Sequence, residues 1–287
     1  QSHMGAPAPP RSMLLPIQDS EDFKGHSRAA HVALAAQYFR RMLRFRHMDF
    51  DHTLWLMLNL CVNPRHVYRS ATYHRGTKNM WARDDPAFVV LLLYLLLVSV
   101  VAWSIGFGRY SPLSYLSLAL YVLLVDFALI GGALATLCWW MANTHLLHRE
   151  GSRPHRQVGE ELTEPCDRVE WLYAFDVHCN GFFVLSMLLH VAQYALLPLL
   201  LQDGFKPAAA SNTLFAAALA AYCYIVFLGY NELPFLRMTE VFVYPVGLII
   251  AAWAASLILA ATNGFSCTWL VASIYFDDDE VATAYGY

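Results

Sequence analysis

Charged residues are scarce in this chain of 287 residues. Asp, Glu, Lys and Arg make up 14% of it and hydrophobic residues 57%, whereas soluble domains have about 25% and about 45–50%. A run of about 20 apolar residues is enough to cross a bilayer. Four long stretches lack Asp, Glu, Lys and Arg altogether: 86–108, 177–202, 207–231 and 241–276. The composition therefore excludes a freely soluble globular domain and predicts a membrane protein.

Several chemical signatures are also absent. The six cysteines form no CxxC pair, so we expect them to be mostly reduced thiols. The chain has no phosphate-binding glycine-rich loop, no HExxH zinc motif and no GxSxG nucleophile motif. No signal-peptide pattern opens the sequence, so we expect the first span to target the chain to the membrane. These absences favour a membrane protein that is not an enzyme and uses no cofactor.

The apolar stretches predict an all-α fold with five transmembrane helices. The second span, which begins after residue 112, is interrupted only by Asp126. Asn263 and Gly264 divide the last stretch into a full span and a tail segment, 264–276, which is too short to cross and whose fold stays open. The predicted spans are about 88–108, 113–143, 177–201, 208–230 and 241–262, within a bundle over residues 86–287.

Charge is distributed unevenly along the chain. The first 85 residues hold 12 Lys/Arg and 7 Asp/Glu, whereas the remaining 202 hold 7 and 15. Short cytosolic segments collect Lys and Arg, so we expect a cytosolic basic region over residues 29–85 and a lumenal C-terminus. Residues 1–28 are expected to be disordered, and the first four residues, QSHM, resemble a cloning remnant.

The basic region should be helical over residues 29–61, which contain no Pro or Gly. Three arginines, at 40, 41 and 44, lie close together on its helical wheel, whereas Arg46 falls on the apolar side. The nine residues TLWLMLNLC, 53–61, are too few to cross, so they should lie along the membrane interface or against the bundle. Asn63 and Pro64 should end this helix.

Two ionisable residues lie near the middle of predicted spans, Asp126 in the second and His190 in the third. Such groups are costly in a bilayer and normally face a partner or a cavity. Adjacent antiparallel spans would place the two at similar depth, so we expect them to pair. The pair would be either a structural clamp or part of a proton or ion relay.

A polar cluster, Asp176, His178 and Asn180, lies where the third span begins on the cytosolic side. It could bind a ligand, or it could close the end of the span through hydrogen bonds to loops or to the head. A second group, in the loop 143–170, has zinc-compatible side chains, but their spacing fits no compact zinc module, so no metal site is predicted. Its members are His145, His148, His155 and Cys166.

Five segments of the sequence resemble the signature blocks of the Unc-fifty (uncoordinated-fifty) family. Their order and the five-span layout match that family from about Arg40 to the end, and WARDDPAF together with YAFDVH is highly specific. Asp126 and His190 also fall where the family places an intramembrane Asp and His. The segments are RFRHMDF (44–50), PRHVYR (64–69), TKNMWARDDPAF (77–88), YAFDVHCN (173–180) and FLGYNELPFL (227–236).

The resemblance implies a multispanning protein of the Golgi and early secretory pathway, with its head in the cytosol. Members are associated with vesicle-mediated protein transport: they recruit a large Arf guanine-nucleotide exchange factor, support retrograde transport and, in animals, allow receptors to reach the cell surface. Cargo receptors are further implied partners. One mammalian member is linked to RNA binding at the inner nuclear membrane.

Our hypothesis is a composite basic platform, formed by the helical head and the second cytosolic loop and displayed by the five-helix bundle, that docks a cytosolic trafficking factor. Arg and aromatic residues dominate interface hot spots, and the same charges would attract anionic lipids of the cytosolic leaflet. One alternative is a transporter of a small molecule, ion or lipid with a cavity at Asp126 and His190. Another is an RNA-binding membrane protein that uses the basic head. The residues predicted to contact the partner are Arg40, Arg41, Arg44, Arg46, Trp81 and Arg83.

Overall fold

The computed structural model describes residues 48–69, 81–83, 85–148 and 168–276. In these ranges the regular secondary structure is helical, and five helices are long and apolar enough to cross a membrane. The predicted all-α fold with five spans is therefore confirmed. The expected helix over 29–61 is described only from residue 48 onward, where α2 occupies Phe50–Val62.

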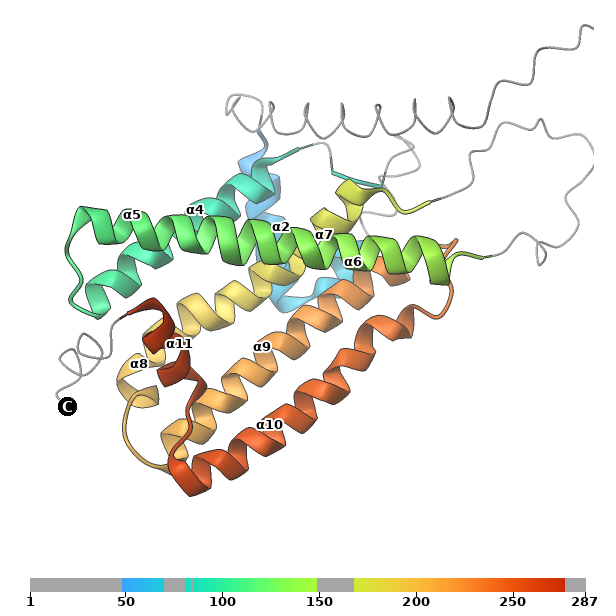
Figure 1. Ribbon diagram of the computed structural model, residues 1–287. Helices are drawn as coiled ribbons and strands as arrows, with labels where there is room; N and C mark the ends of the chain where they lie inside the picture. Colours follow the sequence, from blue (N-terminus) through green and yellow to red (C-terminus); the bar gives the residue numbers. More distant parts are fainter. Residues whose placement is uncertain (1–47, 70–80, 84, 149–167, 277–287) are drawn as a thin grey trace, which may run out of the picture.

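The five spans form an antiparallel bundle (Figure 1). The first and fourth are single helices, α4 (Ala87–Gly106) and α9 (Phe205–Asn231). The other three combine α-helix with π- or 3₁₀-helical segments. The second span consists of α5 (Pro112–Tyr121), η2 (Val122–Ile130), α6 (Gly131–Met141) and η3 (Ala142–Leu146). The third consists of α7 (Trp171–Ser186), η5 (Met187–Ala192) and α8 (Gln193–Leu200). The fifth consists of η6 (Thr239–Val243) and α10 (Tyr244–Asn263).

The ends of the bundle differ in what they carry. One end, here called the head end, holds α2 and the start of α4, α7 and η6. The other, the tail end, holds the start of α5 and α9 and the short helix α11 (Cys267–Tyr275). The third span starts at Trp171, earlier than the predicted residue 177, because its polar first turns are buried by protein rather than by lipid.

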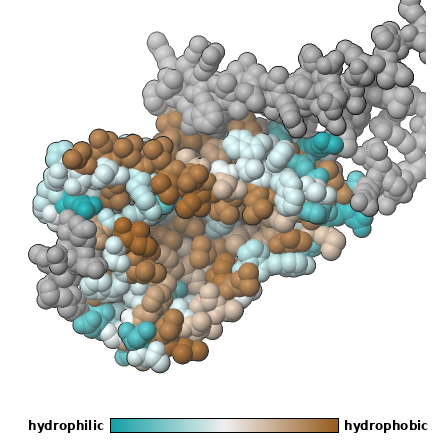
Figure 2. Space-filling view, in the orientation of Figure 1, coloured by the Kyte–Doolittle hydropathy of each residue, from teal (hydrophilic) through white to brown (hydrophobic). Residues whose placement is uncertain are grey.

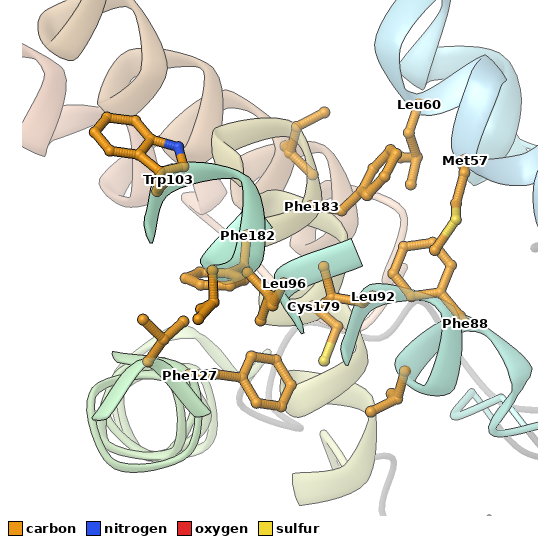
Figure 3. Close-up of a cluster of buried hydrophobic side chains, with 14 of the residues drawn as sticks. Met57, Leu60, Phe88, Leu92, Leu96, Trp103, Phe127, Cys179, Phe182 and Phe183 are labelled. Atoms are coloured by element: carbon orange, nitrogen blue, oxygen red, sulfur yellow. The ribbon is translucent and has the colours of Figure 1, made fainter. Parts of the chain in front are cut away.

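A core of aromatic and branched side chains joins α2, α4, η2 and α7. Phe88 of α4 packs edge-on against Phe183 of α7 with ring centroids 5.8 Å apart, and both belong to the largest buried cluster. In Figure 3, Met57 of α2 points toward Phe88 and Leu60 of α2 toward Phe183. Because Leu60 and Met57 are themselves buried, α2 is packed onto the spans and is part of the bundle.

The outer faces of the spans are apolar. Brown surface covers much of the face shown in Figure 2, and large side chains such as Leu129, Leu248 and Ile258 are more than half exposed. The fifth span is the least buried of the five. Lipid would cover these surfaces, as expected for helices that meet hydrocarbon on one side.

The tail segment, whose fold the sequence left open, forms α11 and packs against α9. A buried polar network holds it in place: Gln193 donates to the Thr268 hydroxyl over 3.1 Å, and the Ser211 and Thr268 hydroxyls lie 2.7 Å apart. The side-chain oxygen of Asn212 accepts from the Cys267 N–H over 2.8 Å. The Thr268 N–H also donates to the Ser211 hydroxyl over 2.8 Å, so the first two backbone N–H groups of α11 have acceptors inside the bundle.

Gly131 and Gly132 have different surroundings, so the same substitution should change stability differently at the two positions. A Cβ on Gly131 would overlap the buried imidazole of His178, whereas a Cβ on Gly132 would meet nothing within 4 Å. Gly131→Ala should lower stability by about 1–3 kcal/mol through overpacking, while Gly132→Ala should leave it unchanged or raise it. Unfolding temperatures in the same detergent would test this, and equal temperatures for the two variants would contradict the packing.

Candidate functional site

Four of the five segments that resemble family signature blocks meet at the head end, although they are far apart in the chain. Residues from PRHVYR, WARDDPAF, YAFDVHCN and FLGYNELPFL contact one another there through hydrogen bonds and ring packing. We call this group the head-end cluster. Its members are Tyr68, Trp81, Arg83, Tyr173, Asp176, Asn180, Gly229, Tyr230 and Phe235.

Arg83 links the segment before the first span to the third span. Its backbone N–H donates to the carboxylate of Asp176 over 2.7 Å, and its guanidinium donates to the side-chain oxygen of Asn180. The guanidinium carbon lies 4.4 Å from the centroid of the Phe88 ring, a distance at which a cation is attracted to the ring face. Arg83 is half-buried, and its Nη1 is buried with no hydrogen-bond partner among the described residues.

Tyr68 extends this linkage to the segment that follows α2. Its hydroxyl accepts from the Asn180 side-chain nitrogen over 3.1 Å, and its ring lies where a Cβ on Gly229 would come within 3.3 Å. Burial raises the pKa of Tyr68 to about 12, and the Asn180 hydrogen bond opposes that shift. The phenol therefore stays neutral at physiological pH and acts as a structural partner.

Aromatic rings close the other side of the cluster. Trp81 packs against Tyr173 and Phe235, each with ring centroids 6.1 Å apart. The Tyr173 hydroxyl donates to the Gly229 carbonyl over 2.6 Å, and Tyr230 stacks on Phe242 at 4.2 Å. Trp81 is therefore wedged between α7 and the turn after α9, and only part of its surface is open to a partner.

Asp85 fixes the start of the first span and the start of α2 at the same point. One carboxylate oxygen accepts from the Ala87 N–H over 3.0 Å and the other from the Asp49 N–H over 2.9 Å. Asp49 in turn caps α2, because its side chain accepts from the His52 N–H over 3.0 Å. A single carboxylate thus satisfies backbone groups at the beginnings of both helices.

His178, a member of the predicted polar cluster, lies among aromatic rings in the interior. Its Nδ1 is 2.9 Å from the Tyr222 hydroxyl, and the rings of Phe127, Phe175 and Phe182 surround it at 5.6–6.3 Å between centroids. Gly131 faces its Nε2, which has no hydrogen-bond partner among the described residues. Asp176 and Asn180 therefore join the start of the third span to the head, whereas His178 faces the interior of the bundle.

The expected pairing of Asp126 with His190 is wrong. Asp126 instead accepts a 2.6 Å hydrogen bond from the Tyr275 hydroxyl of α11. The Nδ1 of His190 is buried with no partner among the described residues, while the His190 carbonyl accepts from the Trp103 indole over 3.1 Å. Sequence spacing missed this partner because the tail segment folds back against the bundle.

Both intramembrane ionisable residues lie in π-helical segments, Asp126 in η2 and His190 in η5. A π-helix widens the backbone and is often found at functional sites. Among the described residues, however, no group of three or more metal-ligating side chains could hold an ion. Asp126 is hydrogen-bonded to Tyr275, and within the described ranges no hydrogen bond joins it to His190.

Some predicted site residues cannot be placed. Arg40, Arg41, Arg44 and Arg46 lie outside the described residues, as do His155 and Cys166. His145 packs edge-on against Trp140, and the His148 N–H donates to the Phe235 carbonyl over 3.0 Å. The sequence interpretation named Tyr68 only as an aromatic residue available for stacking on RNA. It assigned no role to Tyr173 or Tyr275, and Tyr173 was marked only by its place in a signature block.

Similarity to known proteins identifies the family of this chain. The model of the UNC-50 family matches residues 38–276. The chain belongs to the UNC-50 family. The protein unc-50 homolog of Dictyostelium discoideum is 38% identical over 257 residues, which cover 90% of this chain and 93% of that protein. The human unc-50 homolog is also 38% identical, over 90% of this chain and 94% of its own length.

A fungal protein is also similar to this chain. The protein GMH1 homolog of Schizosaccharomyces pombe is 35% identical over 82% of this chain and 94% of its own length. No solved structure matches the chain. The head-end cluster therefore lies wholly within the part of this UNC-50 protein that the family model covers.

Removing the Tyr68 hydroxyl should weaken the head-end cluster. Tyr68→Phe leaves the buried Asn180 N–H without its acceptor, so stability should fall by about 1–2 kcal/mol. Tyr244→Phe is the matched control, because Tyr244 is exposed at the same end. Unfolding temperature is the readout, and equal effects of the two variants would count against the bond.

The contribution of Tyr68 to stability should fall as the pH rises. Its folded pKa, about 12, is above the ordinary value of 10.0, so the neutral phenol favours the folded state. This contribution should be fully present below about pH 10 and should disappear as the pH rises through the folded pKa. The free energies of unfolding of the native chain and of Tyr68→Phe, measured across this pH range, should therefore converge at high pH.

Loss of the hydrogen bond between Tyr275 and Asp126 at the tail end should destabilise α11 locally and leave the rest of the bundle folded. Tyr275→Phe removes the donor to Asp126, so α11 should open more often and its backbone amides should exchange hydrogen faster. Tyr110→Phe, at an exposed tyrosine near the same end, is the control. Unchanged exchange over Cys267–Tyr275 would show that the hydrogen bond does not hold α11.

Proposed function

We propose that this UNC-50 protein is a non-enzymatic trafficking protein of Golgi membranes. Its basic head docks a large Arf guanine-nucleotide exchange factor and supports retrograde transport, with the head in the cytosol and the C-terminus in the lumen. Family membership supports the trafficking role, and the excess of Lys and Arg in the first 85 residues supports the orientation. Cargo receptors would be further partners.

The observation that carries this proposal is the attachment of Asp49 to Asp85. The Asp49 N–H is bonded to the carboxylate just before the first span, and Arg46 precedes Asp49 by three residues. A chain extends by at most about 3.3–3.6 Å per residue, so Arg46 is joined to Asp49 by no more than about 11 Å of chain. The segment that carries the four arginines at 40–46 therefore enters the described part of the protein beside the start of the first span.

The rigidity of this attachment favours a docking role for the neighbouring arginines. Residues 48–69 and 81–83 are bonded to the third span through Tyr68 and Arg83, so the described part of the head is fixed to the bundle. A surface whose flanks are already ordered loses less conformational entropy on binding. Anionic lipids of the cytosolic leaflet would add about 1 kcal/mol for each arginine near the surface.

Charge reversal tests the docking role directly. Replacing Arg40, Arg41, Arg44 and Arg46 with Glu should reduce recruitment of the exchange factor by at least about tenfold, because four favourable charges become repulsive. Recruitment is read as the Golgi-bound fraction of the factor in cells that express only the variant. The variant must itself fold and reach the Golgi.

A control variant separates local from general charge effects. Arg237 is exposed at the head end but lies outside the head and the second cytosolic loop, so Arg237→Glu reverses a charge at the same end without touching the platform. This control should retain recruitment. Equal recruitment by the native chain and the four-residue variant would refute the docking proposal.

A further inference from the structure

α2 has an apolar face that the bundle does not cover. Thr53, Met57 and Leu60 point inward and are buried. The opposite side carries Leu54, Leu58 and Val62, which are 50%, 69% and 84% exposed, together with the half-exposed Trp55. These four residues recur at helical spacing, so they form a continuous stripe, here called the outer stripe of α2.

The position of α2 places this stripe at a membrane boundary. The helix begins at Asp49, bonded to Asp85, and its middle residue Met57 points toward Phe88 in Figure 3. Asp85 and Phe88 are three residues apart, about 5 Å along a helix, whereas Asp49 and Met57 are about 12 Å apart on α2. α2 therefore lies across the start of the first span rather than alongside it.

A helix in this position matches the interfacial class. Its 13 residues are too few to cross a bilayer, and helices of this class lie in the membrane plane with apolar side chains among the acyl chains and basic residues at the headgroups. Trp55 is typical of this depth, because indole prefers the boundary between hydrocarbon and water.

The charge beside the stripe is positive. Arg65, His66 and Arg69 follow α2 and are exposed, whereas the nearest acidic residue of α2 is Asp51, at its other end. The Arg65 Nε donates to the Tyr224 hydroxyl of α9 over 2.8 Å, which fixes the arginine to the bundle at the end of the stripe. The remaining guanidinium nitrogens are suited to a phosphate oxygen.

We propose that the outer stripe of α2 is immersed in the head-side leaflet and that Arg65 and Arg69 bind the headgroups of anionic phospholipids there. The occupant is lipid because the stripe is apolar, lies at the level where the first span enters the bilayer, and ends beside exposed positive charge. This surface is distinct from the four arginines at 40–46, so it does not depend on exchange-factor docking.

Oxidative footprinting of the full-length native chain tests the immersion. The purified protein in lipid nanodiscs is exposed to hydroxyl radicals, and oxidation is mapped by mass spectrometry. Trp55 and Cys61 are exposed and chemically reactive, and so is Met238 in the head-end turn. Trp55 and Cys61 should be oxidised at least severalfold more slowly than Met238, because lipid excludes water from them. Oxidation at the rate of Met238 would overturn the proposal.

Photo-crosslinking identifies what covers the stripe. Nanodiscs that contain phosphatidylserine with a diazirine near the headgroup end of an acyl chain should yield crosslinks on Leu54, Leu58 and Val62. Protection from oxidation without such crosslinks would mean that protein, such as a second copy of the chain, covers the stripe, and this result would also overturn the proposal.

The headgroup contribution is tested separately. Arg65→Gln with Arg69→Gln should reduce the yield of phosphatidylserine crosslinks severalfold and leave the yield with phosphatidylcholine unchanged. Arg237→Gln, at an exposed arginine of the same end, should change neither yield. An equal loss with both lipids, or no loss with either, would refute headgroup binding by these arginines.

Discussion

Polar groups buried at the edge of a membrane-embedded bundle have to find hydrogen-bond partners within the protein, because lipid supplies none. The head end of this chain is organised by that constraint. Asp176 and Asn180 of the third span bind Arg83 from the segment before the first span, and Asn180 also binds Tyr68. Removing any one of these side chains would leave a buried donor or acceptor unpaired, so the parts of the head end are energetically coupled.

The sequence predicted the helices well but not their partners. Five apolar stretches located the spans because hydrocarbon thickness sets a minimum length that composition alone reveals. The breaker pair at residues 63 and 64 likewise marked the end of α2. The contact of Asp126 with Tyr275 was missed, because a partner more than a hundred residues away is chosen by how the tail folds, and no local pattern encodes that.

The polar residues of YAFDVHCN show where sequence reasoning reaches its limit. Their spacing indicated a shared helical face, and two interpretations, ligand binding and closure of the span end, stayed open. Coordinates were needed to show that Asp176 faces a backbone N–H and that His178 is enclosed by rings. Membership of the UNC-50 family adds that similar sequences occur in Dictyostelium discoideum and fission yeast.

The fifth span is both the least buried of the five and longer than a hydrocarbon layer is thick. η6 and α10 together span 25 residues, about 37 Å of helix, which exceeds a hydrocarbon layer of about 30 Å. Few of its side chains are buried, but it packs along α9, where the Trp253 indole donates to Thr213 and Asn212 donates to the Ser256 carbonyl. A helix longer than the hydrocarbon layer tilts or projects beyond it, so bilayer thickness bears on the α9–α10 pair together.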